Sequence, residues 1–329
     1  MSCEGDSVCL DAGPDTGSKR HSDSGSSPKI GKCESPDSKP SGSQNFMSLY
    51  IFVKLLGCGA FGVVNLMQHL DSGKHYAVKV IKKTDPHTNA KTLKEINLGI
   101  KLDSQYVCKV HSYHEDDEHF YIVMEYLEGM DLCDFILKDP TFFINNLKFF
   151  WFVVESILRG LAYLHSQGIA HMDIKPENVF LLLDNQGNII GVKLIDLGLS
   201  ISINEPQNSF KGTPTYMAPD FFSPFCKIDC SVDIWSFGIT AFAMIKASLP
   251  TQIISRKRNP KNRRDEVFFK ISSLLSTVSL TPFEKRSEDP NIAQIEELII
   301  LCLTVDRTNR PTAAKLLKDF LSAIPQISL

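Results

Sequence analysis

Four side chains with a direct chemical use stand at short spacing in the middle of the chain. Asp173 is followed by Lys175 and Asn178, and Asp196 comes eighteen residues after Asn178. A carboxylate can orient a hydroxyl group and accept its proton, and a lysine can stabilise a transferring phosphoryl group. Asn178 and Asp196 supply oxygen ligands of the kind that Mg²⁺ takes together with phosphate oxygens. The set predicts phosphoryl transfer from a nucleotide.

A glycine-rich segment lies more than 100 residues upstream. Gly57, Gly59 and Gly62 fit the pattern G-x-G-x-x-G-x-V, which ends at Val64. A dinucleotide site would need a helix directly after the glycines, whereas residues 63–66 continue as a strand. The glycines are therefore expected to cap a hairpin whose backbone N–H groups can close over phosphates. A plain hairpin fits the spacing about equally well.

Lys79 stands on a predicted buried strand, fifteen residues after Val64. A buried amine is costly unless it is paired. Nucleotide phosphates, together with Glu95 on the next predicted helix, would satisfy it. The alternative is a lysine whose stem lies along the strand while its ammonium group reaches the edge.

The elements that must position these residues form two groups. The first group has five short strands and one helix with apolar residues at helical spacing. The strands are predicted at 50–56, 63–69, 75–81, 107–113 and 120–125, and the helix at 91–102. The second group is mainly helical, with strands at 179–183 and 191–195 and helices at 147–165, 232–246, 291–303 and 312–323. The fold class is therefore α+β, with a small five-stranded lobe and a larger helical lobe.

Composition excludes several classes of protein. The chain has 329 residues and a formal net charge of −3, which gives no overall field toward nucleic acid or anionic lipid. Residues 1–45 are rich in Ser, Gly, Pro and Asp and are predicted to be a disordered tail. The longest apolar stretch, 234–245, is too short for a membrane span, which needs about 20 residues. Nine cysteines without a C-x-x-C pair indicate reduced thiols.

These motifs in this order resemble the eukaryotic-type protein kinase family, over about residues 48–323. The match rests on residues 57–64, 76–79, 171–178, 196–198 and 212–220. The resemblance implies a small lobe at about 48–125, a hinge at 125–128 and a large lobe at about 129–323. It also implies that ATP and Mg²⁺ bind between the lobes.

The resemblance assigns a role to each matching residue. The ATP site would comprise Leu56, Gly57, Gly59, Gly62, Val64, Ala77, Lys79, Glu95, Met124, Glu125, Leu127 and Phe180. Asp173 would be the catalytic base and Lys175 would assist at the γ-phosphate. The metal ligands would be Asn178 and Asp196. The activation segment would contain Ser209 and Thr213, and the structural residues would be Asp220, Asp233 and Arg310.

Two residues indicate the acceptor hydroxyl. Lys175, two residues after the catalytic aspartate, and Thr213, before Pro214, resemble serine/threonine kinases and differ from tyrosine kinases. The implied partners are proteins that present Ser or Thr. Asp131 and Glu177 can attract a basic residue upstream of that hydroxyl, although Asp131 can equally hold the ribose.

The chain departs from the family pattern at several positions. Met172 replaces the usual arginine, which normally binds a phosphorylated activation segment, and Leu197 replaces a phenylalanine. The local sequence His-Met-Asp-Ile-Lys-Pro also occurs in Wee-type kinases. We expect activity without phosphorylation of Ser209. We also expect a small void with a mobile helix at Gly99, and a water-mediated pair between the shortened Asp220 and Arg310.

Two other functions stay open at this stage. The departures from the pattern raise the alternative of a pseudokinase scaffold that binds nucleotide or partners without turnover, although the retained Lys79, Asp173, Asn178 and Asp196 argue against it. A small-molecule kinase of related fold is the third reading, although residues 212–220 and 233–238 argue against it. The basic segment 256–264 is expected to be a nuclear-import signal, a docking site for acidic partners or a solvated loop. The expected location is the cytoplasm, the nucleus or both, of a host cell if the chain is viral.

Overall fold

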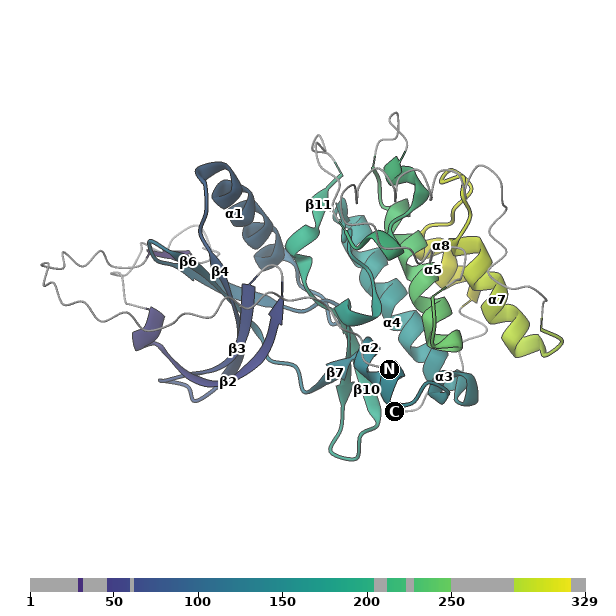
Figure 1. Ribbon diagram of the computed structural model, residues 1–329, viewed down its shortest axis with the longest axis horizontal. Coiled ribbons are helices and arrows are strands. Elements are labelled where there is room, and N and C mark those ends of the chain that lie inside the picture. Colours follow the sequence, from purple (N-terminus) through teal and green to yellow (C-terminus); the bar gives the residue numbers. More distant parts are fainter. Residues whose placement is uncertain are drawn as a thin grey trace, which may run out of the picture.

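The chain folds into two lobes of different construction. The computed structural model describes residues 29–31, 46–59, 62–203, 212–222, 228–249 and 287–320. A small lobe is built on a sheet and a larger lobe is built mainly of helices (Figure 1). The predicted α+β class and its two lobes are confirmed. Within the described ranges, no helix is long and apolar enough to cross a membrane.

The small lobe contains one antiparallel sheet with the strand order β1-β5-β6-β4-β3-β2. Its strands are β1 (Lys29–Gly31), β2 (Tyr50–Gly59), β3 (Gly62–His69), β4 (His75–Lys82), β5 (Val110–Glu115) and β6 (His119–Glu125). The five predicted strands are all present. Val107, the predicted start of β5, instead forms an isolated parallel bridge with Leu194 of the large lobe.

Strand β1 corrects the prediction for part of the N-terminal segment. Residues Lys29–Gly31 pair with β5, and Ile30 lies opposite His114, whereas the composition of residues 1–45 predicts disorder throughout. Pairing at a sheet edge uses backbone N–H and C=O groups, so a segment poor in apolar side chains can still add a strand. The other residues of 1–45 lie outside the described part of the chain.

Helix α1 (Pro86–Lys101) covers one face of this sheet (Figure 1). The carboxylate of Asp85 caps its first turn, which starts the helix five residues before its predicted beginning. Its apolar residues Ile96 and Ile100 pack on Phe120 and other residues of β5 and β6. This packing holds α1 beside the strand that carries Lys79.

The other face of the sheet is covered by a short 3₁₀ turn, η1 (Phe46–Ser48). The Phe46 ring is 1% exposed and stacks on Tyr50 and Tyr121, with ring centroids 4.8 and 4.4 Å apart. Val78 and Val123 lie in the same cluster. Phe46, two residues before the expected boundary at 48, is thus part of the packed core of the small lobe.

The large lobe is built around two buried helices, α4 (Leu147–Ser166) and α5 (Ser231–Lys246). The other described helices are α2 (Leu132–Lys138), α3 (Phe142–Asn145), α7 (Pro290–Cys302) and α8 (Ala313–Phe320). Helix α8 packs on α4, and α7 packs on α5 (Figure 1). The four helices predicted here are present within one residue of their predicted starts, whereas α2 and α3 are not predicted.

Two small sheets hold the chemical segments of the large lobe. Strands β7 (Gly129–Asp131), β9 (Val179–Leu183) and β10 (Ile189–Leu194) form one sheet in the order β10-β9-β7. Strand β8 (Ile169–Ala170) pairs with β11 (Ile201–Ser202). Because β8 leads into residues 171–178 and β11 follows Asp196, this pairing brings the two chemical segments together.

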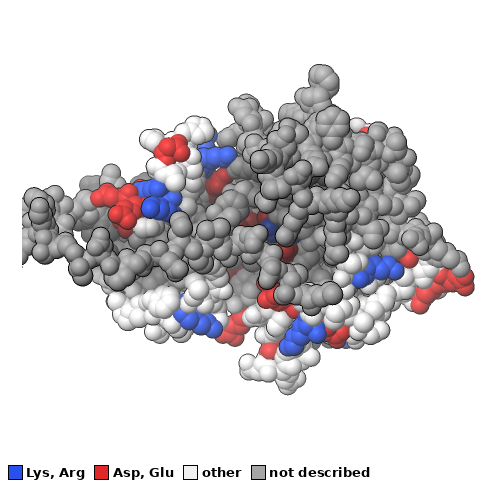
Figure 2. Space-filling view, in the orientation of Figure 1, with Lys and Arg blue, Asp and Glu red and all other residues white. Residues whose placement is uncertain are grey.

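Charged side chains of both signs are interspersed on the surface. On the face that Figure 2 presents, the Lys and Arg residues of the described segments lie near Asp and Glu residues over both lobes. This distribution agrees with the small net charge of −3.

Candidate active site

Lys79 lies on β4, opposite Val64 of β3 and Ile122 of β6. Its side chain is 11% exposed, and its Nζ lies 2.6 Å from Oδ1 of Asp196. The ion pair offsets the cost of burying the amine. The reading of Lys79 as a lysine that reaches the strand edge is therefore wrong. The contact joins the small lobe to the large lobe.

The glycine-rich segment forms the turn between β2 and β3, as predicted. Gly57 pairs with Val64 and Gly59 pairs with Gly62, while residues 60–61 at the tip lie outside the described part. Gly62 adopts φ +128°, and a Cβ there would collide with the carbonyl of Val80. Only glycine fits this position, so this glycine is required by the hairpin itself.

The remaining ATP-site candidates come from both lobes. Ala77 lies opposite Met124, and Ala77 and Lys79 share a face because they are two residues apart on β4. Leu127 lies in the connection between β6 and β7, and Phe180 lies on β9 opposite Asp131. Leu56 is 39% exposed on β2. Contacts of these residues with a nucleotide stay a prediction.

A fully buried carboxylate on α5 holds the backbone of residues 171 and 172, just before Asp173. Asp233 on α5 accepts the backbone N–H groups of His171 and Met172, each at 2.8 Å, and its Oδ2 lies 2.9 Å from Nε2 of His165. Burial alone would raise the pKa of Asp233, but these hydrogen bonds and the nearby histidines outweigh it and hold the pKa below its ordinary value. Asp233 thus connects α5 with the segment before Asp173.

Asp173 is the centre of a dense polar network. Its Oδ1 accepts the N–H and the hydroxyl of Thr213 at 2.9 and 2.7 Å. Its Oδ2 lies 2.9 Å from Nζ of Lys175 and accepts a hydrogen bond from Nδ2 of Asn178, also at 2.9 Å. Lys175 also donates to the Thr213 hydroxyl at 2.8 Å. The structure therefore brings together the predicted base, lysine, amide and activation-segment threonine.

Asp196 connects this network to Lys79. It adopts φ +58°, a left-handed conformation that non-glycine residues rarely take, and its Oδ1 accepts the N–H of Gly198. Ile195, just before it, donates its N–H to the carbonyl of Asn178 at 3.0 Å. Burial would raise the pKa of Asp196, but the charge and hydrogen bond of Lys79 outweigh it and hold the pKa below its ordinary value.

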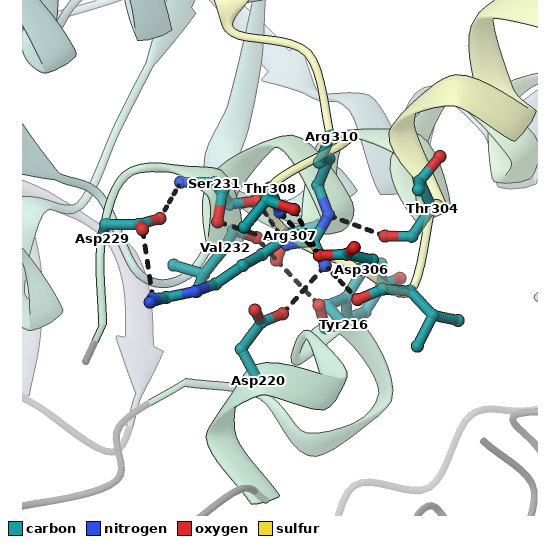
Figure 3. Close-up of polar contacts among 12 residues, drawn as sticks. Tyr216, Asp220, Asp229, Ser231, Val232, Thr304, Asp306, Arg307, Thr308 and Arg310 are labelled. Atoms are coloured by element: carbon teal, nitrogen blue, oxygen red, sulfur yellow. Dashed lines mark hydrogen bonds and ion pairs between the residues drawn. The ribbon is translucent and has the colours of Figure 1, made fainter. Parts of the chain in front are cut away.

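The end of the activation segment is fixed by a buried ion pair. Nη2 of Arg310 lies 2.8 Å from Oδ2 of Asp220, and the two side chains are 0% and 5% exposed. The same guanidinium donates to the carbonyls of Ser231 and Thr304, as Figure 3 shows. The expected water-mediated contact is wrong. The pair is direct because Arg310 reaches the shorter carboxylate.

Two departures from the family pattern have clear structural consequences. Met172 is 5% exposed, adopts φ +73° and packs into the core of the large lobe. A Cβ on Gly99 would lie 3.1 Å from Cγ2 of Val110 and 3.9 Å from Cδ1 of Leu197. The predicted void at Gly99 is therefore wrong, because the branched side chain of Val110 occupies that space. The predicted mobility of α1 rested on this void and therefore has no structural support.

Several predictions remain untested by these contacts. Glu95 is half-buried on α1, and its ion pair with Lys79 stays a prediction. Ser209 and the basic segment 256–264 lie outside the described residues.

Sequence reasoning also missed two residues near the site. His165 at the end of α4 binds Asp233, and Lys193 on β10 lies 2.6 Å from Oε1 of Glu125. Neither stands in a motif, and their partners are 68 residues away in the sequence. No local signal could have identified them.

Comparison with known proteins places this site in a family. A family model described as "Protein kinase domain" matches residues 50–321. This chain belongs to the protein kinase family. The kinase domain thus covers both lobes, and the match begins four residues after the packed Phe46.

Individual relatives support the same assignment. The chain is 38% identical over 212 residues to calcium-dependent protein kinase 6 of Plasmodium berghei, covering 63% of this chain and 13% of that protein. It is 34% identical over 231 residues to serine/threonine-protein kinase cds1 of Schizosaccharomyces pombe, covering 66% and 48%. It is 31% identical over 251 residues to calcium-dependent protein kinase 4 of Plasmodium falciparum, covering 74% and 44%. The chain spans less than half of each relative.

Proposed function

We propose that this kinase domain is an active serine/threonine protein kinase that uses ATP. The observation that carries the proposal is the connected network of Lys79, Asp173, Asn178 and Asp196. Lys79 binds Asp196, Asn178 binds Asp173, and the backbone of Asn178 binds Ile195 next to Asp196. These residues come from separate segments, and each has a direct task in phosphoryl transfer.

The proposed reaction follows from this arrangement. The acceptor hydroxyl attacks the γ-phosphorus of ATP, and Asp173 orients the hydroxyl and accepts its proton. The new O–P bond forms as the bond to the β–γ bridging oxygen breaks, and ADP leaves with that electron pair. Lys175 stabilises the charge on the transferring group, and Lys79 binds the α and β phosphates.

The donor set near Asp196 fits a magnesium ion. The Nδ2 of Asn178 donates to Asp173. The Oδ1 of the same Asn178 amide therefore points away from Asp173. Both hydrogen bonds that Asp196 accepts from described residues end on Oδ1, which leaves Oδ2 available. Two oxygen ligands suit Mg²⁺, which completes its coordination with water and phosphate oxygens. When bound, the ion neutralises charge on the phosphates.

The acceptor class is proposed from Lys175 and Thr213. Their hydrogen bond, 2.8 Å long, and their shared contact with Asp173 fit the pattern that resembles serine/threonine kinases. Asp131 caps α2 through the N–H of Asp134. We propose that Asp131 and Glu177 favour substrates with a basic residue near the acceptor.

The test is phosphorylation of a peptide library by the purified full chain with [γ-³²P]ATP. We expect label on Ser or Thr, and the Asp173→Asn variant should lower the rate by about 10²–10⁴-fold while still binding a nucleotide analogue. The Lys79→Ala variant should lose activity as well. As a control, Asp319→Asn changes an exposed ion pair on α8 and should leave the rate unchanged.

The same experiment distinguishes the proposed function from the scaffold alternative. A wild-type chain that binds nucleotide but labels no peptide above the Asp173→Asn background would be a pseudokinase. Transfer to a small alcohol but to no peptide would indicate a small-molecule kinase.

We also propose a cytoplasmic or nuclear location, on the basis of the reduced-thiol composition and the basic segment 256–264. In a fluorescent fusion, changing the Lys and Arg residues of this segment to Gln should reduce nuclear signal if an import receptor binds it. An unchanged distribution would leave a docking site for acidic partners or a solvated loop as its function.

A further inference from the structure

A half-buried carboxylate joins the start of the hinge to β10, the strand that ends two residues before Asp196. Glu125 is the last residue of β6, and its side chain is 24% exposed. Its Oε1 lies 2.6 Å from Nζ of Lys193 on β10 and accepts the backbone N–H of Lys109 at 2.7 Å. The side chain therefore connects three segments of the chain.

The neighbouring charged groups show that Lys193 is the ion-pair partner of Glu125. The ammonium group of Lys109 donates to the carbonyl of Leu102 and lies 3.4 Å from Asp103, so it is committed elsewhere. Burial and the charge of Glu125 raise the pKa of the neighbouring Cys108 thiol to about 12, so it is neutral. The described residues thus leave Lys193, 14% exposed, as the charge partner of Glu125.

Strand β10 connects Lys193 to Asp196, the proposed metal ligand two residues after the end of the strand. Leu194, next to Lys193, donates to the carbonyl of Tyr106 and accepts the N–H of Cys108, both at 2.8 Å. Ile195 binds Asn178, and Asp196 binds Lys79. Each residue from 193 to 196 is thus fixed to a different segment. Of these contacts, the ion pair of Lys193 with Glu125 is the one that reaches the hinge.

We propose that Glu125 is a positioning residue that, through Lys193, fixes the hinge relative to Asp196. This inference rests on the proposed function, because it concerns the geometry in which ATP is held. The adenine end of ATP is expected at the hinge and the phosphate end at Asp196. A side chain that fixes the separation of these two points stabilises the nucleotide without touching it.

The proposal adds a role for the Glu125 side chain to the one that the sequence suggests. The family resemblance places it among the residues that bind adenine through the hinge. Its backbone N–H donates to the carbonyl of Lys109 at 3.0 Å and its carboxylate is bound to Lys193, so the side chain has a task besides any contact of the backbone carbonyl with adenine. The side chain therefore acts at a distance from the nucleotide.

The experiment is a double-mutant cycle with Glu125→Gln and Lys193→Met. Gln keeps an oxygen that can accept the Lys109 N–H but removes the charge. We expect each single variant to raise the Kd for Mg·AMP-PNP, measured by calorimetry, and the KM for ATP about three- to tenfold. The KM for peptide should stay unchanged. The double variant should be no weaker than the worse single variant, because both remove the same contact.

Two further variants separate positioning from simple stability. Lys193→Arg keeps the charge and should restore most of the affinity for AMP-PNP. Glu155→Gln breaks an ion pair with Arg159 that lies within α4 and shares no residue with the contacts of Glu125 and Lys193, so it should change neither constant. Hydrogen exchange at the Lys109 amide should become faster in Glu125→Ala, since its acceptor is lost.

The inference is overturned if Glu125→Gln lowers the melting temperature but leaves the AMP-PNP affinity unchanged, or if the effects of the two substitutions add. It is also overturned if the wild-type chain does not bind AMP-PNP. If the wild-type chain binds AMP-PNP but phosphorylates nothing, the proposed function fails, and the inference is then judged on the binding constants alone.

Discussion

Two buried carboxylates, Asp173 and Asp233, are each satisfied by more than one partner. Asp173 accepts hydrogen bonds from Thr213 and Asn178 and forms an ion pair with Lys175. Asp233 accepts hydrogen bonds from two backbone N–H groups and contacts the ring of His165. A buried carboxylate without such partners would cost several kcal/mol. These multiple contacts fix the positions of the side chains before any substrate binds, which is the requirement for electrostatic catalysis.

At the residue scale, Gly99→Leu is expected to destabilise the kinase domain. The Cβ alone would lie 3.1 Å from Cγ2 of Val110 and 3.9 Å from Cδ1 of Leu197, and a leucine adds three more carbon atoms at this position. Overpacking of this kind costs about 1–3 kcal/mol. Urea unfolding monitored by circular dichroism measures the change. A stabilised variant would show that the space is empty after all.

At the element scale, the turn η1 is part of the small lobe although it precedes the family match. The aromatic cluster on this face buries Phe46 between Tyr50 and Tyr121. We expect Phe46→Ala to destabilise the domain by about 3–5 kcal/mol, because it leaves a cavity and removes two ring contacts. Met47→Ala is the matched control. Its side chain is 63% exposed, and the change should stay within about 0.5 kcal/mol. Thermal unfolding of both variants tests the prediction, and equal melting temperatures for Phe46→Ala and Met47→Ala would contradict it.

The activation segment is expected to function without a phosphate. Met172 stands where related kinases have an arginine, and its buried thioether has no donor for a phosphate group. The end of the segment is already fixed by the pair of Asp220 with Arg310. We therefore expect Ser209→Ala to keep most of the peptide kinase activity. A loss of more than about tenfold, about 1.4 kcal/mol, would show that Ser209 must be phosphorylated.

At the scale of the whole molecule, acid is expected to weaken the folded state through buried carboxylates. The pKa of Asp233 lies below its ordinary value in the folded chain. The unfolded chain therefore binds more protons near pH 4, and the stability that Asp233 contributes is present above about pH 3.9 and is lost as the pH falls further.

The Asp233→Asn variant tests this dependence. It should be less stable than wild type at pH 7, because the His171 and Met172 N–H groups lose their charged acceptor. Its stability should also fall less between pH 5 and pH 3. Urea midpoints measured across this range provide the comparison. Parallel curves for the two proteins would show that another group controls the acid response.

Much of the fold follows from local patterns. Strand alternation and helical spacing predict the five main strands and the helices α1, α4, α5, α7 and α8, because period and apolar content are properties of short windows. The short helices α2 and α3 and the strand β1 are missed. They depend on capping by Asp131, on packing and on backbone pairing at the sheet edge, which a window of sequence does not contain.

The sequence by itself determined the family to which this chain belongs. The identities and order of Lys79, Asp173, Asn178 and Asp196 predict the proposed chemistry, because that reaction needs those functional groups. Only the tertiary structure decided which partners hold them. Lys79 meets Asp196 across 117 residues, and Glu125 meets Lys193 across 68. Such contacts arise when distant segments pack into one core, and no local spacing rule encodes them.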